Sequence, residues 1–599
     1  MRTAVCAVCL LCVFAIAAAA IDSNEFLPLA ELRPGMTGIG RTIVAGDEPS
    51  EFAVEILGVI DQPGDEDDFI VVRVSGPAIG RAGGIAQGMS GSPVYVDGRL
   101  IGALSRAANW SKDLMPIGLV TPIEPMLAVL DAMAEPPSTA SPEALLNGFT
   151  VVSVDDPLAL AFDPGTPETV VAAPISTPLL TTGLSQRAAA ALLGTERIAR
   201  PDGLAVSFLP IVPAADEALA MNGLSRFGFS LHPLAAAPNA TFGDPADLVA
   251  AGSMGVALAT GDVSVGALGT ITYRDEDLLV GFGHPFIQNG HSAFPLTAVQ
   301  IIDTMKAYDA SFKLGSLGRS LGTVLEDRAV AVGAALGELP PMIDVAIKAT
   351  DEDAGVSRTS RVEIVPESRL LPELMYATGI TAADETLDRI GPGTVEVTFA
   401  FNGHGLPAPI TRRDVFVSAT DVAVYPAWQL ADLVAYLEFN TFVAPQLTTV
   451  SMTMSITEEI RAVEIGHLEI DQYIYYPGEA VRYRLELQTY HGERRVVEGE
   501  IVIPEDLITF TDTIAIRAYG GPRLREAGES PTDLASIEDI ARLIEELPSN
   551  DLLTVELFAL DVLAPYSAAW VGIDLVEIPL DGNVVFGERE IIAYLVEDE

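Results

Sequence analysis

Ser90 lies in a glycine-flanked turn, Gly88-Met89-Ser90-Gly91, just before Pro93-Val94. A nucleophilic serine needs a tight turn that lifts its hydroxyl out of the backbone and aims neighbouring N–H groups at the developing oxyanion. The turn therefore predicts Ser90 as a nucleophile, with the N–H groups of Gly88 and Ser90 as the oxyanion donors. Because Gly- and Ser-rich turns are common, an ordinary turn is the alternative.

Other chemistries fit the sequence poorly. The α/β-hydrolase elbow requires glycine at position 92, which is Ser92. Residues 35–40 have glycines at the wrong offsets for a dinucleotide fingerprint, and no strand–helix–strand unit surrounds them. All three cysteines, Cys6, Cys9 and Cys12, lie within the first 20 residues. A chain without these residues has no thiol ligand, and we expect neither a metal nor an organic cofactor.

Short strands and turns surround the serine turn over residues 24–135, the first predicted domain. Phe52, Val54 and Ile56 alternate with small or polar residues, and Asp97-Gly98 is a strong hairpin signal. The domain is expected to close with a helix that has Thr121 as its N-cap, followed by Pro122 and Glu124.

Three further regions follow. Residues 136–250 are rich in Pro, Ala and Thr, so we expect an insert or connecting domain with one helix near 186–193. Strand patterns resume at 251–412. Residues 413–599 are predicted to form a separate β-sandwich, because apolar and polar residues alternate at 481–488. One helix interrupts this last region, capped by Ser530, with a buried stripe of Leu534, Ile537, Ile540 and Ile544.

The residues around the serine turn resemble a known family. The run from Gly83 to Val94, followed by Asp97 to Ala103, closely resembles the SpoIVB-type peptidases, serine peptidase family fifty-five. This resemblance implies a chymotrypsin-like fold, a serine mechanism and a protein or peptide substrate. The predicted fold class is therefore all-β, with a chymotrypsin-like double β-barrel and the C-terminal β-sandwich.

The family also carries a histidine in an Ala/Gly-x-Gly-His segment at the end of a strand. Gly281-Phe282-Gly283-His284 matches this segment, so the resemblance implies that His284 is the catalytic base in a histidine lobe. His291 lies nearby but lacks the motif. A structural histidine bonded to backbone is the alternative for His284. In the family the histidine lobe precedes the serine lobe, so the order here suggests a circular permutation.

The orienting acid of the family has no match in this sequence. Its place is taken by Ser75, which accepts a hydrogen bond but has no charge to stabilise an imidazolium. Asp275 and Asp277 are candidates for a recruited acid, although a solvated turn is the simpler reading of both. The family's PDZ-like segment is not recognisable here.

The N-terminus and the charge indicate an exported acidic protein. Residues 1–20 read as a signal peptide that ends in an A-x-A site at Ala18 and Ala20, with an uncleaved anchor as the alternative. Removing them changes the net charge from −49 to −50, because they contain one Arg and no acid. Such a surface disfavours nucleic acid and anionic lipid, and no later segment reads as a membrane span. Nothing in the sequence indicates the oligomeric state.

Two functions remain open at this stage. The first is an exported serine endopeptidase acting through Ser90 and His284, located in the periplasm, on the cell surface or outside the cell. The second is a catalytically inactive relative that binds or scaffolds a component of the cell envelope.

Overall fold

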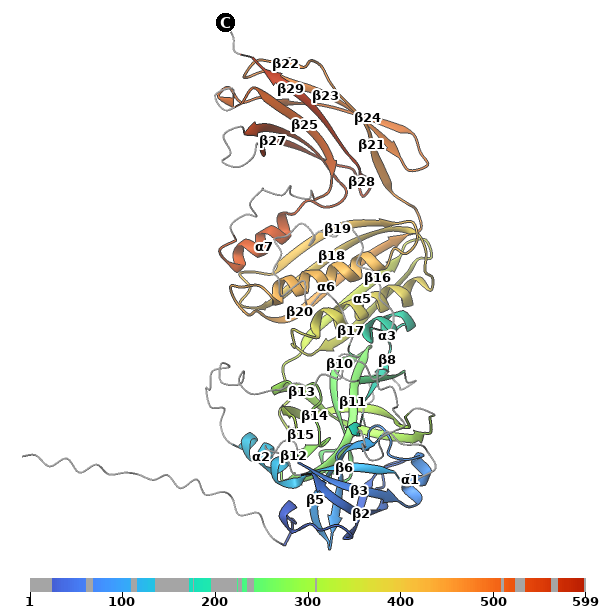
Figure 1. Cartoon of the computed structure of the whole chain (residues 1–599). Coiled ribbons are helices and arrows are strands. Elements are labelled where there is room, and N and C mark those ends of the chain that lie inside the picture. Colours follow the sequence, from blue (N-terminus) through green and yellow to red (C-terminus); the bar gives the residue numbers. More distant parts are fainter. Residues whose placement is uncertain are drawn as a thin grey trace, which may run out of the picture.

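A computed structural model shows a chain made mostly of strands, which confirms the all-β prediction (Figure 1). The structure describes residues 24–60, 68–108, 116–134, 172–175, 177–194, 224, 229–233, 242–307, 310–507, 511–522, 534–561 and 569–596. The predicted signal peptide and Ser530 lie outside these residues. None of the helices in the described ranges is long and apolar enough to cross a membrane.

The first barrel carries the serine turn. Its strands pair in the order β4-β1-β2-β3-β6-β5, and β5 pairs again with β4, so six antiparallel strands form a closed ring. The short helix α1, Pro77–Ala82, precedes the serine turn, and the short strand β7, Ala172–Pro174, extends the sheet at β5. The six strands are β1 Thr37–Thr42, β2 Ser50–Ile60, β3 Phe69–Ser75, β4 Ser92–Val96, β5 Arg99–Ala108 and β6 Ile117–Pro122.

The second barrel carries His284. Its strands pair in the order β10-β13-β14-β15-β12-β11, and β11 pairs with β10 to close a second antiparallel ring. The strands β8, Thr177–Thr182, and β9, Phe229–Pro233, extend this sheet at β11. The six barrel strands are β10 Ser253–Gly261, β11 Ser264–Asp275, β12 Leu278–Gly281, β13 Gly290–Met305, β14 Phe312–Arg328 and β15 Ala331–Leu336.

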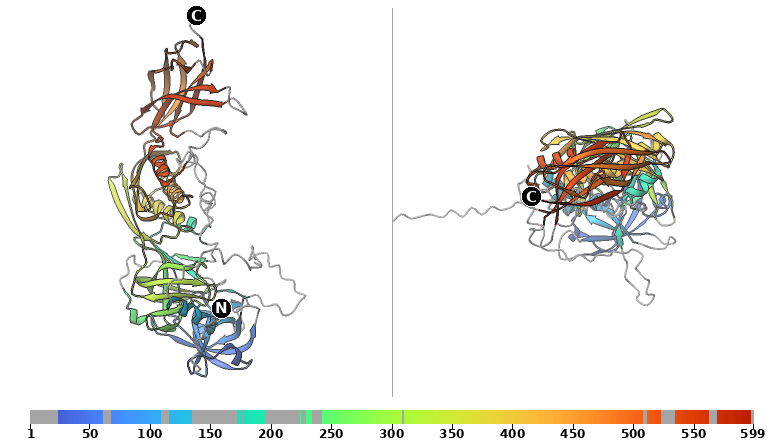
Figure 2. Two further views of the ribbon diagram at one scale, coloured as in Figure 1. Left: turned by 90° about the vertical axis from the view of Figure 1, so that its left-hand side faces the viewer. Right: turned by 90° about the horizontal axis from the view of Figure 1, so that it is seen from above.

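The two barrels share a hydrophobic core. Helix α2, Ile123–Ala134, lies between them and buries Met126 against Val280 and Ala331 of the second barrel. Each fully buried large apolar side chain contributes about 1.5–3 kcal/mol, so this shared core holds the barrels side by side. Figures 1 and 2 show them packed together at one end of an elongated molecule.

Next along the long axis is a sheet covered by two buried helices. Strands β19, β18, β20, β16 and β17 pair in that order, and α5 and α6 lie on one face (Figure 1). Both helices are buried along most of their length, and neither was predicted from the sequence. The elements are β16 Ile343–Asp351, β17 Val356–Ile364, α5 Leu371–Leu387, β18 Gly393–His404, β19 Ile410–Ser418, α6 Val424–Glu438 and β20 Gln446–Thr457.

The C-terminal end consists of two sheets around one core. One sheet has the order β24-β23-β21-β28 and the other β22-β29-β25-β26-β27, and both contribute to the same buried cluster. The boundary predicted at 412/413 falls inside β19, so the chain enters these two sheets only at β21. The strands are β21 Ala462–Ile470, β22 Ile474–Tyr475, β23 Ala480–Thr489, β24 Arg494–Val502, β25 Thr513–Gly520, β26 Leu552–Asp561, β27 Ala569–Pro579, β28 Val584–Phe586 and β29 Glu588–Leu595.

Two predicted helices begin later than the sequence indicates. Helix α2 begins at Ile123 rather than after a Thr121 cap, because the Thr121 hydroxyl instead lies 2.7 Å from the carbonyl oxygen of Gly283 in the second barrel. Helix α7, Ile537–Glu546, is capped by Ser536. Its stripe packs into the core that contains β19, not into the C-terminal sheets.

Candidate active site

The serine turn lies between α1 and β4, pressed against β11 of the second barrel. Gly88 and Gly91 have φ angles of +87° and +91°, a region that favours glycine. A Cβ on Gly88 would lie 2.4 Å from the Leu268 side chain, and one on Gly91 would lie 1.9 Å from the carbonyl oxygen of Thr270. Both glycines are therefore required by backbone conformation and by the approach of the second barrel.

Hydrogen bonds fix the carbonyl groups of Gln87 and Met89, the residues before the two predicted oxyanion donors. The Gln87 carbonyl accepts a bond of 2.9 Å from the backbone N–H of Lys313. The Met89 carbonyl accepts from the backbone N–H of Ser92 at 3.0 Å and from its hydroxyl at 2.6 Å. Both peptide planes are thus held in one orientation.

The N–H groups of Gly88 and Ser90 differ from the other N–H groups of this turn in their hydrogen bonding. In a planar trans peptide the N–H points opposite to the carbonyl. Because the two carbonyls are fixed by hydrogen bonds, the two N–H groups are fixed too, and they point away from the groups that bond the carbonyls. Among the described residues neither N–H has a hydrogen-bond partner, whereas those of Met89 and Gly91 are both bonded. Two free, fixed donors at this spacing are the requirement for an oxyanion hole.

His284 follows β12 through a left-handed turn at Phe282 and Gly283, whose φ angles are +65° and +69°. Its Nδ1 lies 2.7 Å from the carbonyl oxygen of Pro285, so Nδ1 carries the proton and Nε2 is the basic nitrogen. Nε2 is buried and has no hydrogen-bond partner in the described part of the chain. Burial is the main cause that lowers the pKa of His284 to about 4; the bond to the Pro285 carbonyl opposes this shift, and the positive charge of Arg106 adds to it.

The structure brings the Ser90 and His284 segments into contact. A Cβ on Gly91 would lie 2.5 Å from the backbone nitrogen of Phe282, and a Cβ on Gly283 would lie 3.0 Å from the Cβ of Ser105. Ser90 is fully buried and His284 is 3% exposed. The Ser90 hydroxyl, like Nε2 of His284, is a buried polar atom without a partner among the described residues. The site therefore places an unengaged hydroxyl and an unengaged basic nitrogen in neighbouring segments.

The three candidate orienting residues lie elsewhere. Ser75 ends β3, where it pairs with Ala53, and its hydroxyl makes no hydrogen bond within the described ranges. Asp275 and Asp277 flank the exposed turn between β11 and β12, at the opposite end of β12 from His284. The imidazole has the Pro285 carbonyl as its Nδ1 partner, which is the backbone bond expected of a structural histidine. That bond leaves Nε2 free.

Asp327 is a site residue that the sequence did not indicate. Its buried carboxylate on β14 accepts hydrogen bonds from the backbone N–H groups of Phe286, Ile287 and Asn289 at 2.6, 2.8 and 3.0 Å. Burial raises its pKa, and these bonds oppose the rise. Asp327 thus holds the loop that supplies the carbonyl partner of the imidazole. Only the fold places this strand-end acid against that loop.

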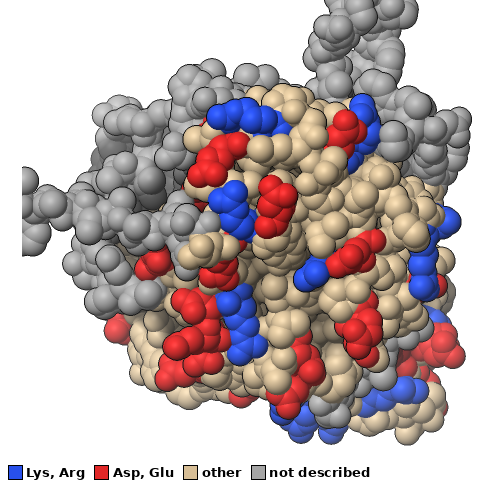
Figure 3. Space-filling view, turned by 90° about the horizontal axis from the view of Figure 1, so that it is seen from below, with Lys and Arg blue, Asp and Glu red and all other residues tan. Residues whose placement is uncertain are grey.

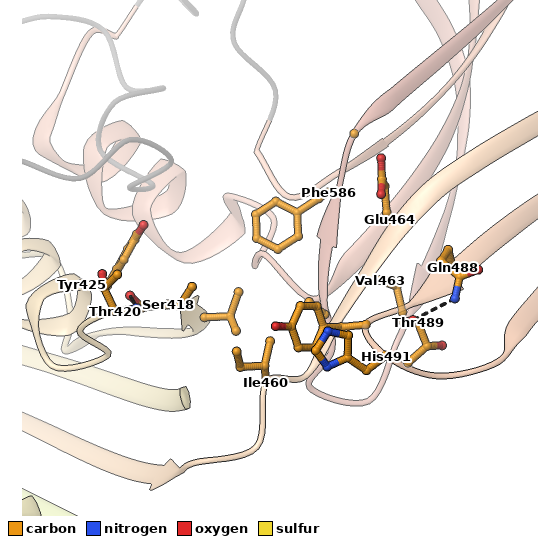
Figure 4. Close-up of a pocket in the computed structure, with 15 residues that line it drawn as sticks. Ser418, Thr420, Tyr425, Ile460, Val463, Glu464, Gln488, Thr489, His491 and Phe586 are labelled. Atoms are coloured by element: carbon orange, nitrogen blue, oxygen red, sulfur yellow. Dashed lines mark hydrogen bonds between the residues drawn. The ribbon is translucent and has the colours of Figure 1, made fainter. Parts of the chain in front are cut away.

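A large hollow lies far from this site, between β19 and the C-terminal sheets (Figure 4). Its volume is about 780 Å³, and aromatic side chains including Tyr425, Tyr490 and Phe586 line it. The rings of Tyr490 and His491 stack at 4.0 Å. The hollow includes neither Ser90 nor His284, so it is separate from the candidate active site. In the described ranges, no group of three or more His, Cys, Asp or Glu residues is placed to hold a metal ion.

Acidic and basic side chains are interspersed on the end of the molecule that the first barrel forms (Figure 3). Exposed ion pairs on this barrel join Arg41 to Glu51 at 2.9 Å and Arg73 to Glu55 at 2.8 Å. Such exposed pairs contribute about 0.2–1 kcal/mol each. Local neutralisation moderates the strong net negative charge on this face.

The first barrel, which carries the serine turn, is similar to a known family. Residues 25–109 match the SpoIVB peptidase S55 family. This confirms the resemblance predicted from the serine turn. The matched residues include Gly88, Ser90 and Ser75, whereas His284 lies outside them. No curated protein matches the chain.

The SpoIVB peptidase match bears on the class of chemistry. It indicates a serine peptidase, and a peptidase implies protein substrates. The matched segment holds the nucleophile candidate and both oxyanion donors. His284, the candidate general base, lies outside the matched residues, and its Nε2 is not hydrogen-bonded to the Ser90 hydroxyl.

Proposed function

We propose that this protein is an exported serine endopeptidase of SpoIVB type, which cleaves protein substrates through Ser90 and His284. The observation that carries the proposal is the hydrogen bonding of the serine turn. Its carbonyls are fixed, and the N–H groups of Gly88 and Ser90 are left without partners among the described residues. A turn with only a structural role has no reason to leave two adjacent donors unsatisfied.

The proposed reaction follows the general serine mechanism. The Ser90 hydroxyl oxygen attacks the scissile carbonyl carbon while Nε2 of His284 takes the hydroxyl proton. The resulting oxyanion accepts hydrogen bonds from the N–H groups of Gly88 and Ser90. His284 then gives its proton to the leaving amine nitrogen, which leaves an acyl-enzyme. Water hydrolyses this ester with His284 again acting as base, and no metal or organic cofactor takes part.

The Pro285 carbonyl takes the place of the orienting acid in this scheme. It holds His284 in the tautomer with a free Nε2, which the reaction requires. It carries only a partial negative charge, so it stabilises the imidazolium less than a carboxylate does. Changing the acid of a related triad to its amide lowers turnover about 10⁴-fold, with the wrong tautomer as the cause. We therefore expect slow turnover, but more than such an amide variant retains.

The order of the barrels supports a permuted form of the family's fold. Each barrel closes as a six-stranded antiparallel ring, and the serine barrel comes first in the chain. A catalytic set is defined by geometry rather than by chain order, so permutation leaves the chemistry intact.

An inactive binding or scaffold protein is the second candidate. The full burial of Ser90 favours it, since a substrate carbonyl must reach this hydroxyl. Among the described residues no carboxylate bonds to the imidazole, whose Nδ1 bonds to the Pro285 carbonyl, and this points the same way. In this reading the barrels and the C-terminal sheets bind a component of the cell envelope.

Labelling with a fluorophosphonate separates the two candidates. The probe reacts with an activated serine, so wild-type protein should be labelled at Ser90, as located by mass spectrometry of the peptides. Ser90→Ala and His284→Ala should abolish labelling. Matched controls are Ser357→Ala on an exposed strand position and His291→Ala, whose side chain is 71% exposed. Both should label like the wild type.

Each outcome of the labelling experiment tests one part of the proposal. Labelling that persists in Ser90→Ala removes Ser90 from the mechanism. Folded wild-type protein that takes up no probe and cleaves no unfolded protein substrate supports the binding candidate. Export is tested separately, by locating the protein in cell fractions and sequencing its N-terminus, which we expect to begin at Ile21.

A further inference from the structure

Lys313, the second residue of β14, is a buried lysine directly behind the serine turn. Its side chain is fully buried, and Nζ donates to the hydroxyls of Thr42 and Thr270 at 3.0 Å each. No carboxylate lies within ion-pair reach of Nζ among the described residues. Burial alone lowers the pKa of this lysine to about 7.

An unpaired ammonium inside a protein is unfavourable, because burial removes its hydration and no opposite charge replaces it. A methionine of similar length would fill the same space at no such cost. Groups that are retained despite this cost occur most often at functional sites. The burial of Lys313 therefore indicates a role beyond packing.

Thr270 connects the ammonium to the serine turn. Its hydroxyl lies 3.0 Å from Nζ of Lys313 and 3.0 Å from the carbonyl oxygen of Gly88. A carbonyl only accepts, so the Thr270 hydroxyl gives its single proton to Gly88 and accepts from Nζ of Lys313 whether that group is charged or neutral. Nζ of Lys313 thus orients the Thr270 hydroxyl, and the chain of two bonds polarises the one that Thr270 donates.

Lys313 also acts through its backbone. Its N–H donates to the Gln87 carbonyl at 2.9 Å, which fixes the peptide that carries the Gly88 N–H. The turn is in direct contact with the side chain, since a Cβ on Gly88 would lie 3.2 Å from the Cδ of Lys313. The peptides on both sides of Gly88 are therefore held from one residue of the second barrel.

We propose that Lys313 is a positioning residue for the oxyanion hole, which it holds through its backbone N–H and through the Thr270 hydroxyl. This inference rests on the proposed peptidase function. Lys313 touches neither substrate nor the reacting atoms, so its effect should fall on turnover and not on substrate binding. Thr270 is the relay in this arrangement, and its hydroxyl is the part that matters.

The test compares five forms of the full chain: wild type, Lys313→Met, Thr270→Val, Thr270→Ser and the control Lys348→Met, an exposed lysine on β16. The measurements are kcat and KM on a protein substrate that the wild type cleaves, the rate of fluorophosphonate labelling, and Tm. Loss of one oxyanion donor lowers turnover by about 10²–10³-fold, so loss of its positioning should lower kcat by about 10-fold or more. KM should stay within about 2-fold.

Thr270→Val should lose activity as Lys313→Met does, whereas Thr270→Ser should keep about half or more of the wild-type kcat because it keeps the hydroxyl. Lys348→Met should behave as the wild type. At about pH 6 the Tm of Lys313→Met should be no lower than that of the wild type, since a purely structural residue would instead lower both Tm and activity.

Three results would overturn the inference. One is a Lys313→Met protein with wild-type kcat and labelling rate. Another is an equal loss of kcat in Thr270→Ser and Thr270→Val. If Lys313→Met does not fold, this comparison is sufficient by itself to test the inference. The third is a wild type that neither cleaves nor labels, in which case the proposed function fails and this role fails with it.

Discussion

Replacing Lys313 with Met should make the free energy of unfolding less dependent on pH. Burial lowers the pKa of Lys313 from 10.5 to about 7. Between these values the unfolded chain holds a proton that the folded protein does not, so wild-type stability rises with pH across this window. At about 1.36 kcal/mol per pKa unit, the full window corresponds to about 5 kcal/mol.

The Met variant lacks this contribution at every pH. Its stability relative to the wild type should therefore be greatest below pH 7 and smaller by about 3 kcal/mol at about pH 9.5. The Thr42 hydroxyl loses its only hydrogen-bond partner among the described residues in this variant, which costs about 1–3 kcal/mol at all pH values. The pH dependence of the difference is thus a cleaner quantity than its absolute size.

The assay is urea unfolding of the full chain at about pH 6 and about pH 9.5, for wild type, Lys313→Met and the exposed control Lys348→Met. A chain of this size does not unfold in one step. The relevant transition is the one that Val324→Ala also shifts, because Val324 is buried on the same strand, β14. A difference between wild type and Lys313→Met that stays constant over this pH range would refute the reasoning, since the ammonium would then not be desolvated.

Three further predictions concern the site. The kcat/KM should rise through about pH 4 and then stay level to neutral pH. The reason is that burial lowers the pKa of His284 to about 4 and only the neutral ring accepts a proton. An inflection of kcat/KM near an ordinary histidine pKa would contradict the buried state. Asp327→Asn should lower kcat with little change in KM and destabilise the protein by about 1–3 kcal/mol, because an amide has one acceptor oxygen for three N–H groups; the exposed control Asp344→Asn should do neither. Gly91→Ala should destabilise the protein by more than about 2 kcal/mol, because its Cβ would lie 1.9 Å from a carbonyl oxygen. Gly58→Ala, with open space around its Cβ, should be nearly neutral in the same denaturation measurement.

The helices show where pattern reading succeeds and where it fails. Helix α7 has an apolar stripe at helical spacing with charged residues between, and the sequence predicted it, although not where it begins. Helices α5 and α6 are buried on nearly every face, and polar residues such as Thr378 and Asp432 are buried along with the apolar ones. A helix without a polar face has no period to detect, so its sequence is indistinguishable from that of buried strands.

The same limit applies to the domain boundary near residue 412. Strand β19 pairs with β18 over residues 410–418, so the chain continues in one sheet where the sequence suggested a new domain. Alternating apolar and polar residues identify a strand, but they do not say which sheet it joins.

The serine turn is what the sequence by itself determined about this protein. Its glycines, Ser90 and the hairpin that follows are neighbours in the chain, so their spacing alone encodes the local conformation and the family resemblance. Within the described ranges, tertiary structure alone decided which N–H groups of the turn stay free, which nitrogen of His284 is basic, and that Lys313 is buried without a counter-charge. These properties depend on hydrogen-bond partners and on loss of hydration supplied by segments far apart in the chain, and no local pattern of residues encodes them.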